Sequence, residues 1–521
     1  MCNTLSSQVI QRAILNANNI AGYFQNTGIF DQNSISGNIA GFEWPKGSGK
    51  TAIYSTGLSI GAIVNNDLRM VCCSYKGEYF GGAIVNRVHI TNSDFKVYSV
   101  YKGDNNSNPD YANWYKMIPY GAPYNDVNNN HVFDIGIDIP GVNDAAQTLF
   151  YCLSDAGESH NAGEGFGGGT LPMFNEMHVT AWCYNTPTYN DMQFIKLENI
   201  NKGLYQWDSV FTGITSDPDI GNANDDYIGC DTLLNLGYCY NAAVTDAVYG
   251  SAPPAAGFIM LKGFTNKNVT PNVSLGMTSY GQSMRSSGLI CEREPNGEPR
   301  GAYNMLKGVK KDLSPYMNPI TTPPVQTKFQ FSGDPETNSG WTAYKGYVLN
   351  CGGTIGEITP VDYQSDKRIV MGSGAGNLSV APGDTQTVVI CQLIAQGINN
   401  KNSVTKLKQL SQTAINFYNS NYTIGVQNIS TEIPGRFSLF QNYPNPFNPV
   451  TNIRYQLSNS GFVTLKIYDA MGKEVETLVN EKQQAGTYEA NFNAANYPSG
   501  IYFYKLETNN FSETKKMILV K

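Results

Sequence analysis

Most of the chain alternates short apolar runs with turn residues, which is the pattern of a β-rich protein. Residues 51–64 (TAIYSTGLSIGAIV) and 80–90 (FGGAIVNRVHI) are typical, because each apolar run is bounded by Gly, Asn, Asp or Thr. The longest apolar run, 388–395 (VVICQLIA), is shorter than the roughly 18 residues of a membrane-spanning helix and predicts a buried strand. We therefore predict a mainly β, multi-domain β-sandwich protein with no membrane span.

Helical periodicity occurs in few places. In residues 403–418 apolar side chains recur every three or four positions, which places them on one face of a short helix. Residues 5–19 show similar spacing and predict a second helix.

The character of the chain changes near residue 435. Residues 419–435 are polar, lack periodicity and end in Pro434-Gly435, as expected of a linker. Beyond them lysine becomes frequent and strict alternation predicts an immunoglobulin-like, seven-stranded sandwich at 436–521. Upstream we expect an N-terminal β-rich region at 1–120 and β-rich passenger domains at 121–418.

The C-terminal segment carries four phrases in a fixed order: QNYPNPFNP (441–449), IYDAMG (467–472), SGIYFYKL (499–506) and KKMILVK (515–521). Together they resemble the type A C-terminal sorting domain of type IX secretion substrates. The resemblance implies that the type IX machinery reads this domain and exports the protein, which is then released or attached to surface lipopolysaccharide. The sorting signal so implied comprises Gln441, Asn442, Tyr443, Pro444, Asn445, Pro446, Phe447, Gly500, Lys515 and Lys516.

The proline-rich phrase cannot form an inner strand, since each proline removes a backbone donor. We expect it to lie along the sandwich in extended form, anchored by Phe440, Tyr443 and Phe447. The region from about 120 to 420 resembles, more loosely, uncharacterised ectodomains of the same bacteria, and this likeness implies no activity.

The resemblance also implies a location outside the cell. Substrates of this pathway carry a signal peptide, whereas residues 1–20 have no basic segment followed by an apolar one. We therefore expect an extracellular or cell-surface protein whose signal peptide is not present in this sequence.

Composition agrees with an exposed protein. The charged fraction, 15%, is below the average of about 25% for soluble proteins, while Gly (52 residues) and Tyr (33 residues) are abundant. Such a surface presents amides, hydroxyls and phenols rather than ions. With a net charge of −7 and no basic cluster, the chain cannot release counterions from nucleic acid, so we expect no nucleic-acid partner.

The ten cysteines include no C-x-x-C pair, which argues against a zinc ribbon. Cys230 and Cys239 close a short loop and are a candidate disulfide in an oxidising compartment. The alternative is that they are buried free thiols acting as small apolar side chains.

Two segments supply oxygen atoms of the kind that calcium prefers, and either ion would be structural. Residues 216–231 (SDPDIGNANDDYIGCD) contain the first candidate set, and residues 126–134 (DVNNNHVFD) follow part of the EF-hand spacing without its glycine and glutamate. Plain Asx-turn chemistry is the alternative for both. The candidate ligands are Asp217, Asp219, Asp225, Asp226 and Asp231, and more weakly Asp126, Asn128, Asn130 and Asp134.

Three further motifs suggest chemistry that their surroundings do not support. GSGKT (47–51) ends like a phosphate-binding loop, but Trp44 replaces its first glycine and a strand follows, so we expect no nucleotide. GLSIG (57–61) lacks the helix that follows a nucleophile elbow. The glycosidase-like carboxylates are interpreted as exposed loop residues: Glu158, Glu164 and Glu176.

Without a coherent catalytic set, we expect an exported structural or adhesive protein with no identified activity. One alternative is a secreted hydrolase or glycan-binding protein. Another is a subunit of an extracellular polymer or filament that self-associates through strand edges.

Overall fold

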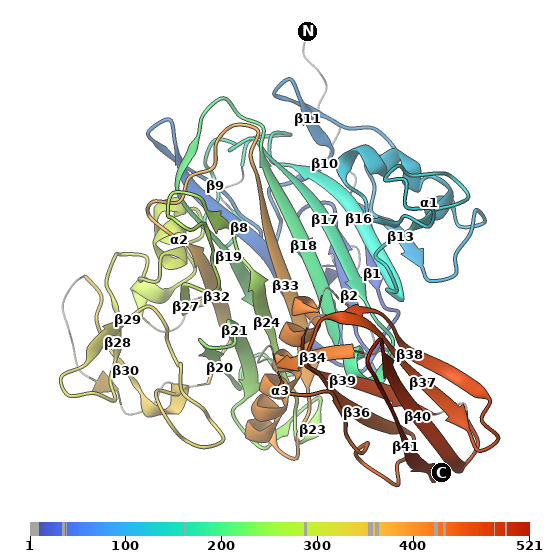
Figure 1. The fold of residues 1–521 in the computed structure, drawn as a ribbon. Helices are drawn as coiled ribbons and strands as arrows, with labels where there is room; N and C mark the ends of the chain where they lie inside the picture. Colours follow the sequence, from blue (N-terminus) through green and yellow to red (C-terminus); the bar gives the residue numbers. More distant parts are fainter. Residues whose placement is uncertain are drawn as a thin grey trace. The chain divides into compact units, whose positions relative to one another are not determined.

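The structure is a computed structural model that describes residues 10–33, 37, 39–160, 163–285, 289–352, 358–359, 364–420, 422, 426–430, 434–483, 485–494 and 497–521. The chain folds as two compact units, residues 1–411 and 412–521 (Figure 1). Antiparallel sheets dominate both units, which confirms the predicted mainly β, multi-domain sandwich fold. Within the described ranges, no helix is both long and apolar enough to cross a membrane.

Two large antiparallel sheets form the first unit. The first sheet runs in the order β27 (Ser279–Met284), β32 (Lys367–Gly374), β19 (Trp207–Asp217), β8 (Ser55–Val64), β3 (Ile29–Phe30), β2 (Ala21–Gln25), β6 (Phe42–Glu43) and β7 (Thr51–Ile53), with β1 (Arg12–Leu15) beside β2 and β9 (Asp67–Val71) beside β8. The second runs in the order β10 (Phe80–Gly81), β16 (Gln147–Ser154), β17 (Asn175–Cys183), β18 (Met192–Asn201), β33 (Thr385–Ala395), β24 (Ala255–Lys262), β21 (Leu236–Asn241) and β20 (Asp226–Asp231), with β13 (Tyr98–Tyr101) beside β16.

Short ribbons and helices decorate these sheets. The ribbons pair β4 (Gln32–Asn33) with β5 (Ile39–Ala40), β11 (Ala83–Val85) with β12 (Val88–Ile90), β14 (Tyr124–Asn125) with β15 (Ile139–Pro140), β22 (Thr245–Asp246) with β23 (Gly250–Ser251), β25 (Thr265–Asn266) with β26 (Val273–Ser274), β28 (Tyr316–Asn318) with β29 (Val325–Thr327), and β30 (Tyr347–Val348) with β31 (Ile358–Thr359). The helices are α1 (Pro109–Ala112), η1 (Trp114–Tyr120), η2 (Pro187–Tyr189), η3 (Ile290–Glu292), α2 (Pro299–Leu306), η4 (Ala343–Lys345) and α3 (Asn400–Asn419).

The central strands are covered on both faces, so even their polar residues are buried. Every residue of β16 and β17 is buried. Outside β16, Phe150 packs with Trp114 and Met117, while α2 covers the first sheet with Tyr303 and Leu306. Burial of apolar surface beneath these covering layers, away from water, is the main contribution that stabilises such a core.

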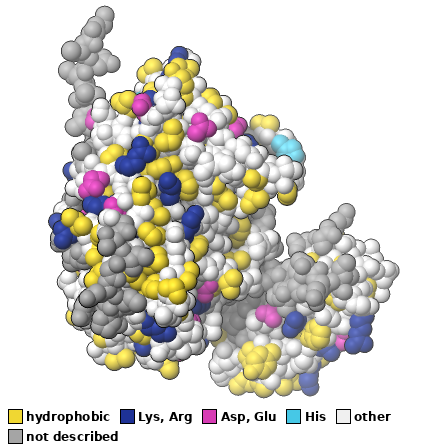
Figure 2. All heavy atoms as spheres, turned by 90° about the vertical axis from the view of Figure 1, so that its left-hand side faces the viewer, with side chains coloured by type: hydrophobic (Ala, Val, Ile, Leu, Met, Phe, Trp, Pro, Cys, Tyr) yellow, Lys and Arg dark blue, Asp and Glu magenta, His cyan; other side chains and the backbone are white. Residues whose placement is uncertain are grey.

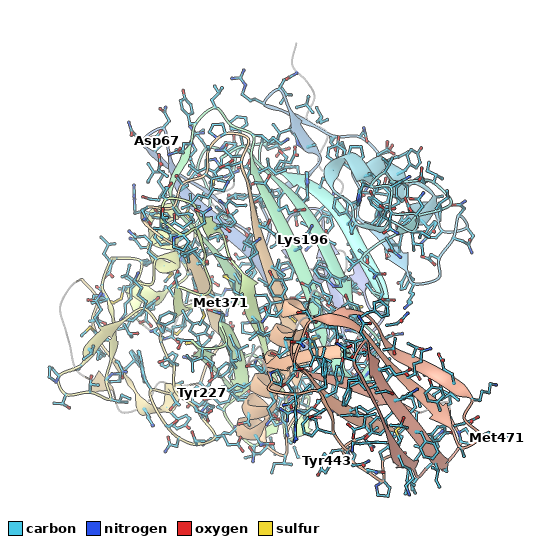
Figure 3. The ribbon with its side chains drawn as sticks, in the orientation of Figure 1. Asp67, Lys196, Tyr227, Met371, Tyr443 and Met471 are labelled. Atoms are coloured by element: carbon cyan, nitrogen blue, oxygen red, sulfur yellow. A yellow bond between two sulfur atoms is a disulfide. The ribbon has the colours of Figure 1, made fainter. Side chains whose placement is uncertain are left out.

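The space between the two sheets contains large side chains and a few glycines that admit them. A Cβ atom on Gly237 of β21 would lie 2.6 Å from the ring of Tyr280 in β27. Met371 of β32, labelled at the centre of the first unit in Figure 3, is fully buried there. The two sheets therefore pack face to face as a sandwich.

A polar bridge crosses this core. The Gln392 amide in β33 donates to Gln193 Oε1 at 2.8 Å and to Asp31 Oδ1 at 3.3 Å. Asp31 lies between β3 and β4 with a φ of 64°. Desolvation raises the pKa of Asp31 to about 8.

Four sequence predictions can be compared with these elements. The run 388–395 lies in β33, and the helix predicted at 403–418 is α3, as expected. The helix predicted at 5–19 is wrong over its described part, because residues 12–15 form β1 and pair with β2. The boundary predicted at residue 120 separates no sheet, since β8 pairs with β19 across it.

The predicted linker 419–435 is only partly visible, because residues 421, 423–425 and 431–433 lie outside the described ranges. Within it, β34 (Val426–Ser430) pairs with β39 (Gly486–Asn493). Part of the expected linker is thus a sheet strand.

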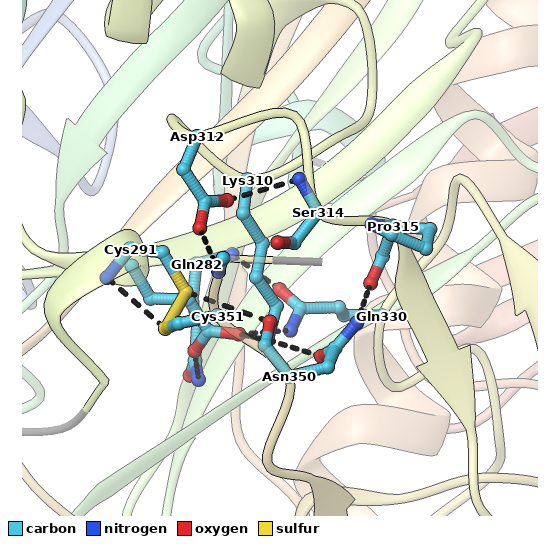
Figure 4. Close-up of a disulfide and its surroundings, with 11 residues drawn as sticks. Gln282, Cys291, Lys310, Asp312, Ser314, Pro315, Gln330, Asn350 and Cys351 are labelled. Atoms are coloured by element: carbon cyan, nitrogen blue, oxygen red, sulfur yellow. Dashed lines mark hydrogen bonds and ion pairs between the residues drawn. A yellow bond between two sulfur atoms is a disulfide. The ribbon is translucent and has the colours of Figure 1, made fainter. Parts of the chain in front are cut away.

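One disulfide joins Cys291 and Cys351 (Figure 4). The predicted partners Cys230 and Cys239 are instead buried thiols. In the β20–β21 pairing Cys230 lies opposite Gly237, and Cys239 opposite Ile228. The two cysteines are therefore diagonal neighbours about 7–8 Å apart, which exceeds the reach of a disulfide.

The second unit contains two four-stranded sheets. Ile453, Leu465, Phe492 and Tyr504 are among the buried residues of their shared core. There are eight strands rather than the expected seven because β34 joins the four-stranded sheet that contains β39. Their orders are β34–β39–β36–β35 and β38–β37–β40–β41, with β35 (Ser438–Leu439), β36 (Val450–Leu457), β37 (Gly461–Asp469), β38 (Glu474–Gln483), β40 (Gly500–Thr508) and β41 (Phe511–Leu519).

The outer surface matches the low charged fraction. On the face of the first unit drawn in Figure 2, basic and acidic side chains lie scattered among hydrophobic and uncharged groups. This face offers no single basic patch of the kind that binds a polyanion.

Candidate functional site

A polar pocket of about 460 Å³ opens at the end of β19 in the first unit. Two tyrosines, four carboxylates and two arginines contribute to its lining. Such a concentration of charged groups in one hollow is the strongest candidate site in the described part of the chain. The lining residues are Gln32, Tyr54, Tyr75, Gly163, Gly165, Asp217, Asp219, Arg285, Glu294, Asn296, Asp366 and Arg368.

Strand pairing brings Asp217 and Arg368 together. β19 and β32 run antiparallel with Ser216 opposite Ile369, so Asp217 and Arg368 are the next opposed residues. Arg368 Nη2 lies 3.1 Å from Asp217 Oδ2, and its Nη1 pairs with Asp366. Register therefore joins residues that are far apart in the sequence.

Arg368 is the centre of a network. Its Nε atom donates to Glu294 Oε1 and to the Tyr75 hydroxyl oxygen, both at 2.7 Å. The Tyr75 hydroxyl can donate its own proton to Glu294 Oε1 at 2.7 Å or to Asp217 Oδ2 at 3.1 Å. Only 8% of Arg368 is exposed, so these bonds form largely out of water and fix the guanidinium plane.

Glu164 holds the turn that carries Tyr75. Its carboxylate accepts hydrogen bonds from the backbone amides of Ser74, Tyr75, Lys76 and Gly77. Desolvation raises the pKa of Glu164 to about 7, although these amides oppose that shift. Glu164 thus positions Tyr75 in the lining of the pocket.

The expectation of exposed glutamates was wrong for two of the three residues. Glu164 is fully buried, and Glu176 is buried in β17 with His178 Nε2 at 3.0 Å. Backbone amides and a histidine supply the partners that make their burial possible. Only Glu158 is exposed.

Burial also changes the acidity of the pocket. Desolvation and repulsion from Asp219 raise the pKa of Asp217 to about 7, against the attraction of Arg368. Desolvation raises the pKa of Asp219 to about 6, again opposed by Arg368. Both groups therefore titrate close to neutral pH, as functional carboxyl groups often do.

Three carboxylates of the pocket could hold a metal ion. One oxygen each from Asp217, Asp219 and Asp366 lies within 4.8 Å of the other two. Asp217 Oδ1 and Asp219 Oδ1 are buried and have no hydrogen-bond partner. Carboxylate oxygens are the ligands that hard divalent cations prefer.

The structure groups only part of the first predicted calcium set. Asp217 and Asp219 lie in the pocket, and Asp226 is buried nearby, where its Oδ2 accepts from the Ile220 amide at 2.9 Å. Asp225 is half-buried, with Oδ1 unpartnered. Asp231 lies at the far end of β20, where it pairs with Lys408 at 3.2 Å.

Sequence reasoning missed Asp366, Arg368, Tyr75, Glu294 and Arg285. The signal nearest to them was Asp366-Lys367-Arg368, a charged triplet that leads directly into an apolar strand. Charged residues at the start of a buried strand need partners of opposite charge, and here those partners line the pocket.

The second predicted calcium loop uses its oxygens internally. The Asn128 and Asn130 amides donate to Asp134 Oδ2 at 2.8 and 2.6 Å. Asp126 Oδ2 accepts from the His131 amide at 2.7 Å. These contacts are those of consecutive Asx turns on an exposed loop.

The decoy serine lies inside a sheet. Ser59 is in the middle of β8, fully buried, and its Oγ accepts from the Cys73 amide at 3.2 Å. The strand continues past it to Val64 in place of the helix that a nucleophile elbow requires.

The segment of the implied sorting signal is held by hydrogen bonds from both its backbone and its side chains. Asn442 N donates to the Tyr504 hydroxyl at 2.8 Å, and Phe447 exchanges backbone bonds with residues 518 and 520 at 2.9 and 3.0 Å. Phe447 is buried, as expected. Tyr443, however, is 82% exposed and points away from the sandwich (Figure 3), so its backbone and not its ring anchors the chain.

The remaining signal residues lie on or near the last strand. Gln441 Nε2 donates to the Lys516 carbonyl at 2.8 Å, and Asn445 Oδ1 accepts from the Ile518 amide at 3.0 Å. Lys515 pairs with Glu513 at 3.0 Å, and Gly500 is exposed where β40 begins. The Pro444 carbonyl accepts from Thr451 at 2.8 Å, while Pro446 is exposed.

Comparison with known families identifies this second region. Residues 441–521 match the family model described as a secretion system C-terminal sorting domain. The match confirms the resemblance read from the sequence and indicates export to the cell surface or the extracellular space. No protein among the curated sequences compared matches the chain.

Likenesses to solved structures are weak. A polysaccharide lyase is 8% identical, with a TM-score of 0.20 over 68% of this chain, which spans 37% of the lyase chain. PorZ, a surface component of the type IX secretion system of Porphyromonas gingivalis, is 10% identical, with a TM-score of 0.13 over 99% of this chain and 59% of its own. At these scores neither likeness bears on function.

Proposed function

We propose that this exported chain, which carries a type IX sorting domain, is an adhesive cell-surface protein whose first unit binds glycans. The proposal rests on the pocket around Arg368, where donors, acceptors and aromatic rings converge in a volume of about 460 Å³. That volume lies within the range of about 300–1,000 Å³ typical of ligand sites.

The chemistry of the lining suits a hydroxyl-rich ligand. Arginine donates to sugar hydroxyls and carboxylates accept from them, so Arg285 and Asp219 offer complementary partners. Tyr54 and Tyr75 present rings 6.3 Å apart and tilted by 59°, a surface on which a sugar ring can pack. A neutral glycan satisfies both charge types at once.

Binding of the secreted protein to a glycan array tests this proposal. We expect Tyr54→Ala and Arg285→Ala to weaken binding of the selected glycan by about tenfold, which corresponds to about 1.4 kcal/mol. Tyr115→Ala is the matched control, because Tyr115 is 43% exposed and lies outside the pocket. An array without any bound glycan, or binding by both pocket variants that equals wild-type binding, would overturn the proposal.

A second candidate function is glycan hydrolysis. Carboxyl oxygens of Asp217 and Asp219 lie within 4.8 Å of each other in the pocket, which favours it because glycoside hydrolysis uses a pair of neighbouring carboxyl groups. For a hydrolase, Asp217→Asn would abolish release of reducing sugar from a bound glycan yet keep the binding. Absence of sugar release by the wild-type protein would leave binding as the function.

A further inference from the structure

Three of the four pocket carboxylates come from two neighbouring strand ends. Asp217 ends β19, Asp219 follows it by two residues, and Asp366 immediately precedes β32. One oxygen from each lies within 4.8 Å of the others, a spacing that a single cation can bridge.

Acidic residues often gather without an ion, so a second observation is needed. Asp217 is only 6% exposed, and its Oδ1 has no hydrogen-bond partner, while Oδ2 is already engaged by Arg368 and Tyr75. Asp219 Oδ1 is likewise buried and unpartnered. A buried carboxylate oxygen without a donor is costly unless something positive lies beside it.

Arg368 does not meet this need. Its three nitrogen atoms are directed to Asp217 Oδ2, Glu294 and Asp366, and none donates a hydrogen bond to the two orphan oxygens. The lining of the pocket holds four carboxylates against two arginines, which leaves two formal negative charges. A divalent cation would balance them.

We infer that the pocket binds a divalent cation, calcium in preference to magnesium, through Asp217, Asp219 and Asp366. Calcium accepts about six to eight oxygen ligands in irregular geometry, whereas magnesium demands a tight octahedron. Three carboxylates beside an open pocket leave positions for water or for ligand hydroxyls. In this last respect the inference rests on the proposed function, because the cation would make glycan binding calcium-dependent.

The first experiment measures the cation alone. Full-length protein stripped with EDTA is titrated with Ca²⁺ and with Mg²⁺ by calorimetry, and Tb³⁺ emission is excited through tyrosine, since Tyr54 and Tyr75 line the site. We expect one Ca²⁺ per chain, a higher melting temperature, and Tb³⁺ emission that Ca²⁺ displaces. No heat, no shift and no sensitised emission would overturn the inference.

Variants locate the ion. Asp219→Asn and Asp366→Asn should each weaken Ca²⁺ binding at least tenfold, and Asp366, about one-third exposed, is the variant less dependent on folding. Asp208→Asn is the matched control on the same strand, because Asp208 is exposed at its other end. If Asp126→Asn abolishes binding while the two pocket variants retain it, the exposed 126–134 loop holds the ion and the inference fails.

Glycan binding with and without EDTA separates the two proposals. Ca²⁺ binding in the absence of any glycan binding keeps the inference and refutes the proposed function. Glycan binding that is unchanged by EDTA, in a protein that takes up no Ca²⁺, keeps the proposed function and refutes the inference.

Discussion

Asp31 shows how far this protein takes ionisable groups out of water. Its Oδ1 accepts from Gln392, while its Oδ2 is buried without a partner. A charged carboxylate at this place would be strongly destabilised, so the side chain keeps its proton. The raised pKa of Asp31, about 8, therefore links stability to pH.

We predict that Asp31→Asn flattens the pH dependence of stability. The folded protein holds this proton up to about pH 8, whereas the unfolded chain releases it near 3.8. The stability contributed by this group is therefore full at low pH and is lost as pH rises through that window, by at most about 1.4 kcal/mol per pH unit. Asparagine cannot titrate and tolerates the φ of 64°.

Urea unfolding between pH 5 and 8 tests this prediction. All five tryptophans lie between residues 44 and 341, so their fluorescence reports on the first unit alone. The difference between the wild-type and variant slopes is the quantity to compare, because other buried carboxyl groups affect both proteins equally. Identical slopes would contradict the raised pKa.

At the scale of elements, local patterns in the sequence predicted local structure well. The period of 3.6 found α3 at Asn400–Asn419, and the apolar run at 388–395 found β33. The same reasoning failed at residues 12–15, where pairing with β2 overrides a weak helical spacing.

The pocket could not be predicted in this way. Asp217 and Asp219 were selected for their density of oxygen, but Arg368 meets Asp217 only because β32 pairs with β19 in one register. Glu164 was noticed for the wrong reason, since its partners are four backbone amides that no sequence motif announces. Strand register between distant segments and the positions of backbone donors depend on the tertiary structure, so local sequence patterns do not predict them.

Removal of the disulfide should destabilise the elements between its ends. Cys291 and Cys351 are 60 residues apart in sequence, and the loop that they close includes α2, β28 and β29. Without the bond the unfolded chain gains conformational entropy, so we predict that the double Cys→Ala variant is less stable by up to about 4 kcal/mol.

Fluorescence-monitored unfolding can measure this change, since Trp341 lies within the loop. Wild-type protein treated with a reductant provides the control and should lose a similar amount of stability. Equal midpoints for oxidised, reduced and Cys→Ala proteins would contradict the structural role of the bond.

At the scale of the whole molecule, the sorting domain and the candidate pocket fall in different units. The sorting-domain match, residues 441–521, lies within the second unit, and the pocket lies wholly in the first. Each unit has its own core, so the loss of one need not unfold the other.

We predict that deletion of residues 436–521 abolishes export but keeps the first unit folded. Cell fractionation with intact-mass measurement would locate the product, and tryptophan fluorescence would report its fold. Phe462→Ala serves as the control for export, because Phe462 is 44% exposed and lies outside the four phrases that carry the resemblance. Recovery of the truncated chain outside the cell would contradict a sorting role for this domain.

The bonds between residues 441–447 and 516–520 have a consequence for timing during synthesis. A ribosome must translate about seventy further codons after Phe447 before its partners Ile518 and Val520 exist. A nascent or prematurely stopped polypeptide therefore lacks the bonds that join the proline-rich phrase to the last strand. A receptor that recognises the assembled surface would bind complete chains and not fragments. The sorting domain would then select for chains whose synthesis is finished.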